Sequence, residues 1–111
     1  MPSVLFVRIR SGLDGDEFDR RLLERRPRFR EVPGLVQKIY GRDPETGDVC
    51  GIYLFEDAES LAAFRETELA HTIPSAYEAL EVRREVFDVL YTLRPERDPF
   101  AEGAAGRVSG A

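Results

Sequence analysis

The 111-residue sequence is poor in the residue types that build disulfides, metal centres and many cofactor sites. It contains one cysteine, Cys50, and one histidine, His71. A single cysteine cannot form an internal disulfide, and its isolation fits a reducing cytosol. One cysteine and one histidine also cannot supply the four ligands of a structural zinc site. We therefore expect a cytoplasmic protein that holds no metal.

Sequence signatures of nucleotide-derived cofactors and of common hydrolases are likewise missing. No GxGxxG follows an expected strand, no P-loop motif occurs, and neither HExxH nor GxSxG is present. We therefore expect that the protein uses no cofactor. If it is an oxygenase, the substrate itself has to supply the electrons.

Long apolar runs are absent, and acidic residues outnumber basic ones. No run approaches the roughly 20 apolar residues of a membrane-spanning helix. Because Arg8 and Arg10 interrupt the first apolar stretch, we expect no secretory signal. The 21 acidic and 16 basic residues give a net charge of −5, which repels phosphate backbones and anionic lipids. We expect neither a nucleic-acid partner nor a membrane partner.

One segment has the opposite charge, because residues 20–30 hold six arginines and a single acid, Glu24. Two interpretations are open. The segment can be a solvated helix face, since three acid–arginine pairs have the i,i+4 spacing of helical ion pairs. These pairs are Asp16–Arg20, Glu17–Arg21 and Glu24–Arg28. Alternatively, it can be a basic patch that holds an anionic ligand or a nucleic acid.

The hydrophobic pattern predicts one domain over residues 1–95 and a disordered or loosely packed tail over residues 96–111. The expected strands are 3–11, 35–42, 49–55 and 82–93, and the expected helices run from about 14 to 30 and from 57 to about 69. A hairpin loop is expected at 43–48, and a linker with a short helical turn at 71–80. This βαββαβ order predicts an α+β fold, a four-stranded antiparallel sheet with both helices on one face.

The expected strands carry apolar side chains on both faces. In the first strand, for example, Val4 and Phe6 lie opposite Leu5 and Val7. The helices can cover only one face, and the other would be a larger apolar patch than soluble monomers usually expose. A second copy of the chain is the simplest cover, so we expect a homodimer.

Three segments of the sequence carry a family resemblance: VPGLVQKIYGRD, GIYLFED and HTIPSAYE, at residues 32–43, 51–57 and 71–78. Over about residues 3–95 the chain resembles the YdhR-type monooxygenase group, an antibiotic-biosynthesis-monooxygenase-like part of the dimeric α+β barrel superfamily. The resemblance implies a ferredoxin-like protomer, a barrel of two facing sheets, and an apolar pocket between sheet and helices. It also implies cofactor-free oxygenation of an aromatic substrate. The chain lacks the tryptophan that some of these enzymes have.

His71 is the candidate catalytic base, because it is the only imidazole and titrates near neutral pH. It follows the second expected helix, at an end where pockets in this superfamily open. The structural alternative is that His71 caps the last carbonyls of that helix or faces solvent.

Two charged residues fall on apolar helix stripes and are candidates for ligand binding. At 100° per residue, Arg25 lies among Phe18, Leu22 and Phe29, and Glu68 lies beside the stripe of the second helix. Charges on inward stripes are expected to be paired, so we predict that Arg25 and Glu68 approach each other. Arg25 would then bind a substrate oxyanion, or it would form a structural salt bridge or turn outward.

Aromatic residues complete the candidate site. We assign ligand contacts to Tyr53 and Tyr77, and pocket walls to Phe64 and Phe87, although core packing would account for each of them equally well. Tyr40 and Tyr91 are further sources of a hydroxyl group.

Taken together, these features predict cofactor-independent monooxygenation of an aromatic or phenolic small molecule. One alternative is a non-catalytic small-molecule-binding or stress-response protein. Another is a haem-handling relative in which His71 ligates the iron.

Overall fold

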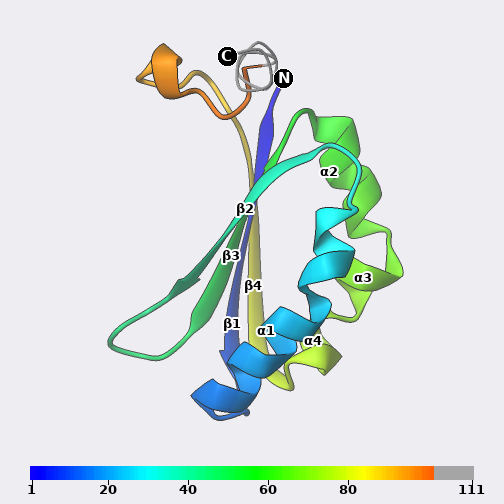
Figure 1. The fold of residues 1–111 in the computed structure, drawn as a ribbon, viewed down its shortest axis with the longest axis vertical. Coiled ribbons are helices and arrows are strands. Elements are labelled where there is room, and N and C mark those ends of the chain that lie inside the picture. The colour runs from blue at the N-terminus through cyan, green and yellow to red at the C-terminus, as the bar shows by residue number, and fades with distance from the viewer. Residues whose placement is uncertain (102–111) are drawn as a thin grey trace.

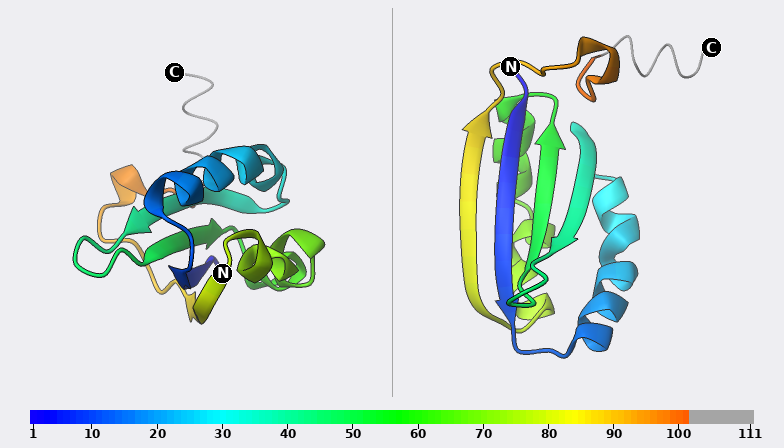
Figure 2. Two further views of the ribbon diagram at one scale, coloured as in Figure 1. Left: turned by 90° about the horizontal axis from the view of Figure 1, so that it is seen from below. Right: turned by 90° about the vertical axis from the view of Figure 1, so that its left-hand side faces the viewer.

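A computed structural model, which describes residues 1–101, contains one four-stranded sheet with helices on one side (Figure 1). The strands are β1 (Ser3–Ser11), β2 (Leu35–Arg42), β3 (Val49–Phe55) and β4 (Ala79–Asp88). Their spatial order is β2-β3-β1-β4, and all neighbours are antiparallel (Figure 2). This is the ferredoxin-like α+β arrangement, as predicted.

Four helices lie on the same side of the sheet. They are α1 (Gly15–Arg30), α2 (Ala58–Arg65), α3 (Glu68–His71) and α4 (Ile73–Ala76). The Asp14 side chain accepts a hydrogen bond from the Glu17 amide and so caps α1, which buries Phe18 and Phe29 against the sheet. Helix α1 flanks β2, and the shorter helices lie behind the centre of the sheet (Figure 2). No helix in residues 1–101 is both long and apolar enough to cross a membrane.

The second expected helix is broken, which corrects its predicted end near Leu69. Helix α2 ends at Arg65, and Thr67 begins the separate helix α3. The Thr67 hydroxyl donates to the Phe64 carbonyl at 2.6 Å and accepts from the Ala70 amide at 3.2 Å. Threonine competes in this way with the helical backbone pattern, so the chain turns before it resumes a helix.

The last strand also differs from its expected bounds of 82–93, since β4 covers Ala79–Asp88. Beyond Asp88 one more backbone bond forms, from the Val89 amide to the Pro2 carbonyl at 2.9 Å. Proline has no amide hydrogen to return, so the ladder stops there. A 3₁₀ turn covers Pro95–Arg97, and residues 102–111 of the predicted tail lie outside the described residues.

Strand β2 contains an irregularity that decides which side chains face the helices. The register shifts between Leu35 and Gln37, so that Lys38 lies opposite Tyr53 and Tyr40 opposite Gly51. Both Tyr53 and Gly51 are buried on the helix side of the sheet. Lys38 and Tyr40 therefore lie on that side, whereas simple alternation from Leu35 would have placed both on the helix-free face.

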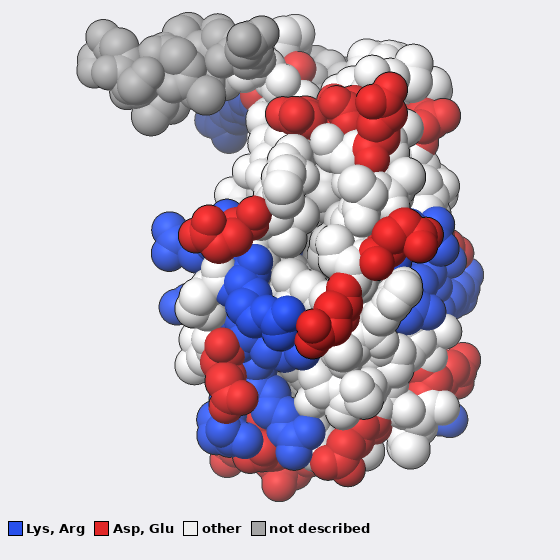
Figure 3. Space-filling model, turned by 90° about the vertical axis from the view of Figure 1, so that its right-hand side faces the viewer, with Lys and Arg blue, Asp and Glu red and all other residues white. Residues whose placement is uncertain are grey.

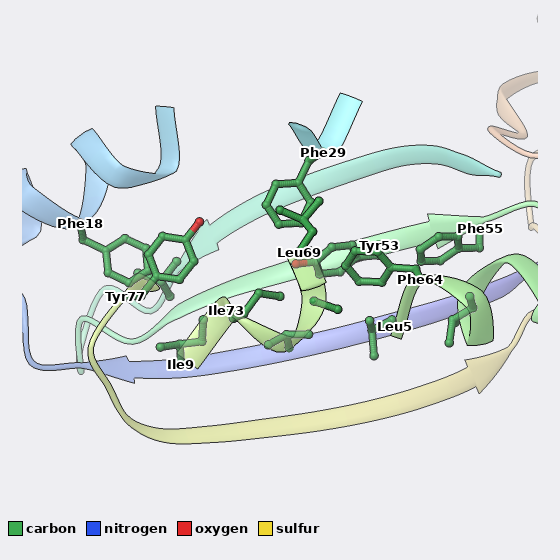
Figure 4. Close-up of a cluster of buried hydrophobic side chains, with 14 residues drawn as sticks. Leu5, Ile9, Phe18, Phe29, Tyr53, Phe55, Phe64, Leu69, Ile73 and Tyr77 are labelled. Atoms are coloured by element: carbon green, nitrogen blue, oxygen red, sulfur yellow. The ribbon is translucent and has the colours of Figure 1, made fainter. Parts of the chain in front are cut away.

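An aromatic row fills the space between the helices and the sheet (Figure 4). The fourteen buried residues of this core are Leu5, Val7, Ile9, Phe18, Phe29, Val49, Tyr53, Phe55, Leu61, Phe64, Leu69, Ala70, Ile73 and Tyr77. Phe64 contacts Phe29, Tyr53 and Phe55 at ring-centroid distances of 5.3 to 6.2 Å. Phe18 stacks on Tyr77 at 4.7 Å. The core is thus aromatic beneath α1, where the candidate site lies.

The opposite face of the sheet has an apolar part that nothing in residues 1–101 covers, next to a charged part formed by Arg8, Arg10, Glu81, Arg83 and Glu85. Its apolar side chains, all half-buried or exposed, are Val4, Phe6, Ile39, Cys50, Ile52, Leu54 and Phe87. Past β4, Leu90 and Tyr91 are about four-fifths exposed, as is Leu93. This combination is typical of a surface that another molecule covers.

Gly34 offers a test of how α1 is joined to the sheet. Its φ is +76°, and a Cβ built on it would lie 2.2 Å from Ser60 Oγ on α2. We expect Gly34→Ala to lower the free energy of unfolding by about 2–4 kcal/mol, from backbone strain and steric overlap together. Gly47→Ala is the control, because Gly47 has φ +79° but nothing within 4 Å of a built Cβ. Equal urea midpoints for the two variants would contradict the overlap.

Candidate active site

Two cations, Arg25 of α1 and Lys38 of β2, reach the aromatic core from different elements. The Arg25 guanidinium carbon lies 5.5 Å from the centroid of the Tyr77 ring and 5.8 Å from that of Phe29. The Lys38 ammonium lies 3.5 Å from the Phe29 centroid and 4.4 Å from that of Tyr53. Phe29 is therefore in contact with both cations, and the two charges share one aromatic enclosure.

Neither cation has a carboxylate partner. Among residues 1–101, no carboxylate oxygen lies within 4.0 Å of the Arg25 or Lys38 nitrogens. Arg25 instead donates to the Leu69 carbonyl at 2.9 Å and to the Thr72 hydroxyl at 3.2 Å. Enclosed charges are normally paired, so two cations without a counter-ion make this a site that favours an anion.

The Lys38 amine is held among aromatic rings instead of in water. Tyr40 supplies a third ring, with its centroid 4.3 Å from the amine. Gly51 of β3 makes the space, because a Cβ there would approach Lys38 Cε to 3.2 Å and the Tyr53 ring to 2.9 Å. Burial, together with the nearby Arg25 charge, lowers the Lys38 pKa from 10.5 to about 7. At neutral pH a substantial fraction of this amine is therefore unprotonated and able to accept a proton.

Arg25 and Tyr77 each have one buried polar group without a hydrogen-bond partner in the described part of the chain. These groups are the Arg25 Nε and the Tyr77 hydroxyl. Figure 4 shows the Tyr77 hydroxyl directed toward the side of the core on which Phe29 lies. Burial raises the pKa of Tyr77, so its hydroxyl stays protonated and can donate. Unsatisfied buried donors are uncommon and costly, and a ligand oxygen would satisfy both.

A groove of about 540 Å³ between α1 and β2 leads from the surface to Phe29 and Lys38, and Arg25, Tyr53 and Tyr77 are not part of its lining. Phe29, Lys38 and Tyr40 line its inner part, and Arg26 and Arg30 line it from α1. Tyr40 is 37% exposed, so the groove brings solvent up to the aromatic rings. A planar molecule can therefore reach Lys38 from this side.

His71, the candidate base from the sequence, lies elsewhere. It is exposed at the end of α3 and lines a different hollow of about 450 Å³, together with Arg84 of β4 and the core residues Phe64 and Ile73. That hollow does not include Arg25, Lys38 or any tyrosine. The structure thus separates His71 from Arg25 and Lys38.

The other predicted site residues divide between the enclosure and the surface. Arg25, Tyr53 and Tyr77 lie together around Phe29, and Phe64 packs against the same rings. Phe87 instead pairs with Val4 and is half exposed on the helix-free face, so it is not a wall of this pocket.

The predicted approach of Arg25 to Glu68 is wrong. The Glu68 side chain is exposed, and its nearest cation is Arg28 at 3.9 Å. The prediction assumes one continuous helix from Leu61 to Leu69, but the break at Thr67 changes the direction in which the Glu68 side chain points. A terminal nitrogen of Arg25 donates instead to the Leu69 carbonyl of α3 and to the hydroxyl of Thr72, the C-cap of α3.

The sequence prediction missed Lys38 as a site residue and named Tyr40 only as a further source of a hydroxyl group. A signal was present, since Lys38 is the only lysine of the chain beside fifteen arginines. A residue that occurs once, within an apolar strand, is a candidate for a specific role, because lysine shifts its pKa readily when buried and arginine does not.

Comparison with known proteins agrees with the fold. Residues 5–95 match the family model described as Putative mono-oxygenase ydhR. The chain belongs to the YdhR family. No curated protein matches it.

Solved structures share the fold of this YdhR-family chain at low sequence identity. Rv0793 from Mycobacterium tuberculosis is 14% identical, with a TM-score of 0.69 over 85% of this chain and 100% of its own. SnoaB, a cofactor-independent oxygenase from Streptomyces nogalater, is 15% identical, with a TM-score of 0.69 over 83% and 96%. A putative antibiotic biosynthesis monooxygenase from Caulobacter crescentus is 14% identical, with a TM-score of 0.68 over 81% and 91%. These likenesses establish the fold.

The donor set of the site suits an organic anion better than a metal ion. Residues 1–101 contain no group of three or more histidine, cysteine, aspartate or glutamate side chains placed to bind a metal. Around Phe29 the available groups are an amine, a guanidinium and phenol hydroxyls. These can take up a proton and hold an oxyanion.

Proposed function

We propose that this YdhR-family protein oxygenates a phenolic or enolic aromatic small molecule without a cofactor, in the enclosure around Phe29. The observation that carries the proposal is that two cations without a carboxylate partner in residues 1–101, Arg25 and Lys38, lie against the same buried aromatic ring, Phe29. Such a pair of cations stabilises the anion of an aromatic acid relative to its neutral form. Formation of that anion is the step that makes a substrate reactive toward dioxygen.

The residues have separate roles in this reaction. Unprotonated Lys38 accepts the phenol proton, and its pKa of about 7 matches a base that works near neutral pH. The Arg25 Nε and the Tyr77 hydroxyl, both without partners, donate to the resulting oxyanion. Phe29 and Tyr53 hold the ring and exclude water.

Atoms and electrons balance with dioxygen as the only co-substrate. The anion transfers an electron to dioxygen, and recombination forms a carbon–oxygen bond at an unsubstituted ring carbon. That carbon loses its proton and the oxygen–oxygen bond breaks. One oxygen atom stays in the quinone product, and the other leaves as water. The four electrons that dioxygen accepts all come from the substrate.

We further propose that the working form is a cytoplasmic homodimer. The apolar helix-free face and the exposed segment with Leu90, Tyr91 and Leu93 support this assembly, because a second copy would bury both. Apposed sheets would also shield the back of the pocket from solvent.

Oxygen consumption with a panel of anthrols and hydroquinones tests the function directly. We expect uptake above the uncatalysed rate, with one atom of ¹⁸O₂ in the product by mass spectrometry. We expect His71→Ala to keep most of this activity, because His71 lies outside the enclosure, and Lys38→Met to lose it.

Three outcomes would lead to another assignment. Ligands that bind around Phe29 without oxygen consumption would favour the non-catalytic binding protein. Activity that is lost with His71→Ala and kept with Lys38→Met would show that His71, and not Lys38, is the base. A Soret band on haem titration that disappears with His71→Ala would favour the haem-handling alternative.

A further inference from the structure

We propose that the ligand of the groove between α1 and β2 is an aryl carboxylate, whose carboxylate Arg26 and Arg30 bind at the mouth while its ring enters toward Phe29 and Lys38. The inference deepens the proposed function by naming a substrate class. It concerns binding, and its test does not depend on turnover.

The groove carries only positive charge. Its lining consists of Arg26, Phe29, Arg30, Leu35, Val36, Gln37, Lys38 and Tyr40, with three cations and no carboxylate. The whole chain has a net charge of −5, so a hollow without acidic residues departs from the average of the molecule. The potential in this groove therefore favours an anion.

The arginines of α1 divide into two groups by their contacts. Arg20 binds Glu17 at 2.6 Å and Glu24 at 2.8 Å, and Arg21 binds Glu17 at 2.8 Å. Arg28 lies 3.9 Å from Glu68. Within residues 1–101, Arg26 and Arg30 have no carboxylate within 4.0 Å. Figure 3 shows basic and acidic side chains interspersed on the helix-bearing face.

A solvated helix face with internal ion pairs thus accounts for Arg20 and Arg21, but not for Arg26 and Arg30. These two are one helical turn apart, and both line the same groove. Guanidinium groups bind carboxylates through paired hydrogen bonds, so two of them at one mouth are suited to a carboxylate group.

The depth of the groove sets the shape of the ligand. Leu35 and Val36 give the mouth an apolar wall, and the rings of Phe29 and Tyr40 continue it inward to Lys38. A molecule with a carboxylate at one end and a hydroxylated ring at the other satisfies both ends.

Calorimetry with 6-hydroxy-2-naphthoate and its methyl ester tests this inference on the full chain. The two probes differ in the carboxylate charge and in one methyl group. We expect the acid to bind about 10- to 100-fold more tightly than the ester, as for one or two charge-assisted hydrogen bonds. This preference should fall as salt rises, because the mouth is open to solvent.

Matched charge variants assign the effect. Arg26→Gln with Arg30→Gln should remove the preference for the acid, while Arg20→Gln with Arg28→Gln, which changes net charge equally on the same helix, should keep it. Equal affinity for acid and ester, no binding of either, or an equal loss in the control pair would overturn the inference. Arginine-dependent binding without oxygen uptake by hydroxyaryl acids would leave the inference standing and refute the oxygenase. Oxygen uptake with neutral phenols but not with hydroxyaryl acids would support the oxygenase and overturn the aryl carboxylate inference.

Discussion

Replacing Lys38 with methionine should lower kcat/KM for oxygenation by about 10²- to 10⁴-fold, the usual contribution of a positioned base. Methionine keeps the length and apolar stem of the side chain, so Phe29 and Tyr53 retain a neighbour. Only the amine that accepts the phenol proton is lost. The measurement is initial-rate oxygen consumption with a substrate that the wild-type chain converts.

The pH dependence of the wild-type rate should follow the Lys38 amine. Because its pKa is lowered to about 7, kcat/KM should rise as pH increases through that value and then level off. Lys38→Arg restores the charge without a base that can lose its proton, so it should stay inactive while still binding phenolate analogues. An active Lys38→Arg variant would show that this position only holds the oxyanion.

Lys38→Met should also stabilise the fold at neutral and acidic pH. Below pH 7 Lys38 is charged in both the folded and unfolded states, and the folded state bears the full cost of enclosing that charge. Between pH 7 and 10.5 the unfolded state holds more protons, so wild-type stability rises with pH. We expect Lys38→Met to gain up to about 5 kcal/mol of unfolding free energy below pH 7, with the difference vanishing above pH 10.5. A less stable variant at pH 6 would contradict the enclosure of this charge.

Replacing Ile52 with aspartate should convert the proposed dimer to a monomer. Ile52 lies at the middle of the helix-free face, where it is opposite Phe6 on β1 and Ile39 on β2. A carboxylate there would have to be buried without a partner when two such faces meet. We expect sedimentation velocity at micromolar concentration to show the mass of one chain for the variant and of two chains for the wild type.

Ala58→Asp is the control for this experiment, because Ala58 is exposed on α2, on the other side of the sheet, and its change adds the same charge. It should leave the dimer intact. Stability gives a second readout, since the unfolding midpoint of a dimer rises with protein concentration and that of a monomer does not. A wild-type chain that sediments as a monomer, with a midpoint independent of concentration, would exclude the dimer.

The sequence predicts most of the fold because the elements are set by local chemistry. Asp14 caps α1 as expected, and the hairpin between β2 and β3 forms at the proline and glycine signals of residues 43–48. The wrong predictions concern the ends of elements that depend on a neighbouring segment of the chain. Strand β4 stops at Asp88 because its partner strand is preceded by Pro2, which an alternating apolar pattern cannot reveal.

The candidate site is predictable only in part. The helical spacing correctly places Arg25 on the inner side of α1, over Phe29. The sequence singles out Lys38 as the only lysine, but its orientation toward the helices could not be predicted, because a shift in register between Leu35 and Gln37 brings it to that side, next to Tyr40. Such a shift depends on pairing with β3, and periodicity within one strand does not encode it.

Because it is the only lysine, Lys38 carries the only ε-amino group of the protein. Reductive alkylation, which acts on amines, therefore has a single side-chain target. Mass spectrometry of the Lys38 peptide would then report directly on access to the interior, and a bound ligand would be seen as slower labelling at that residue. The chain thus carries its own single-site occupancy probe, without any engineered label.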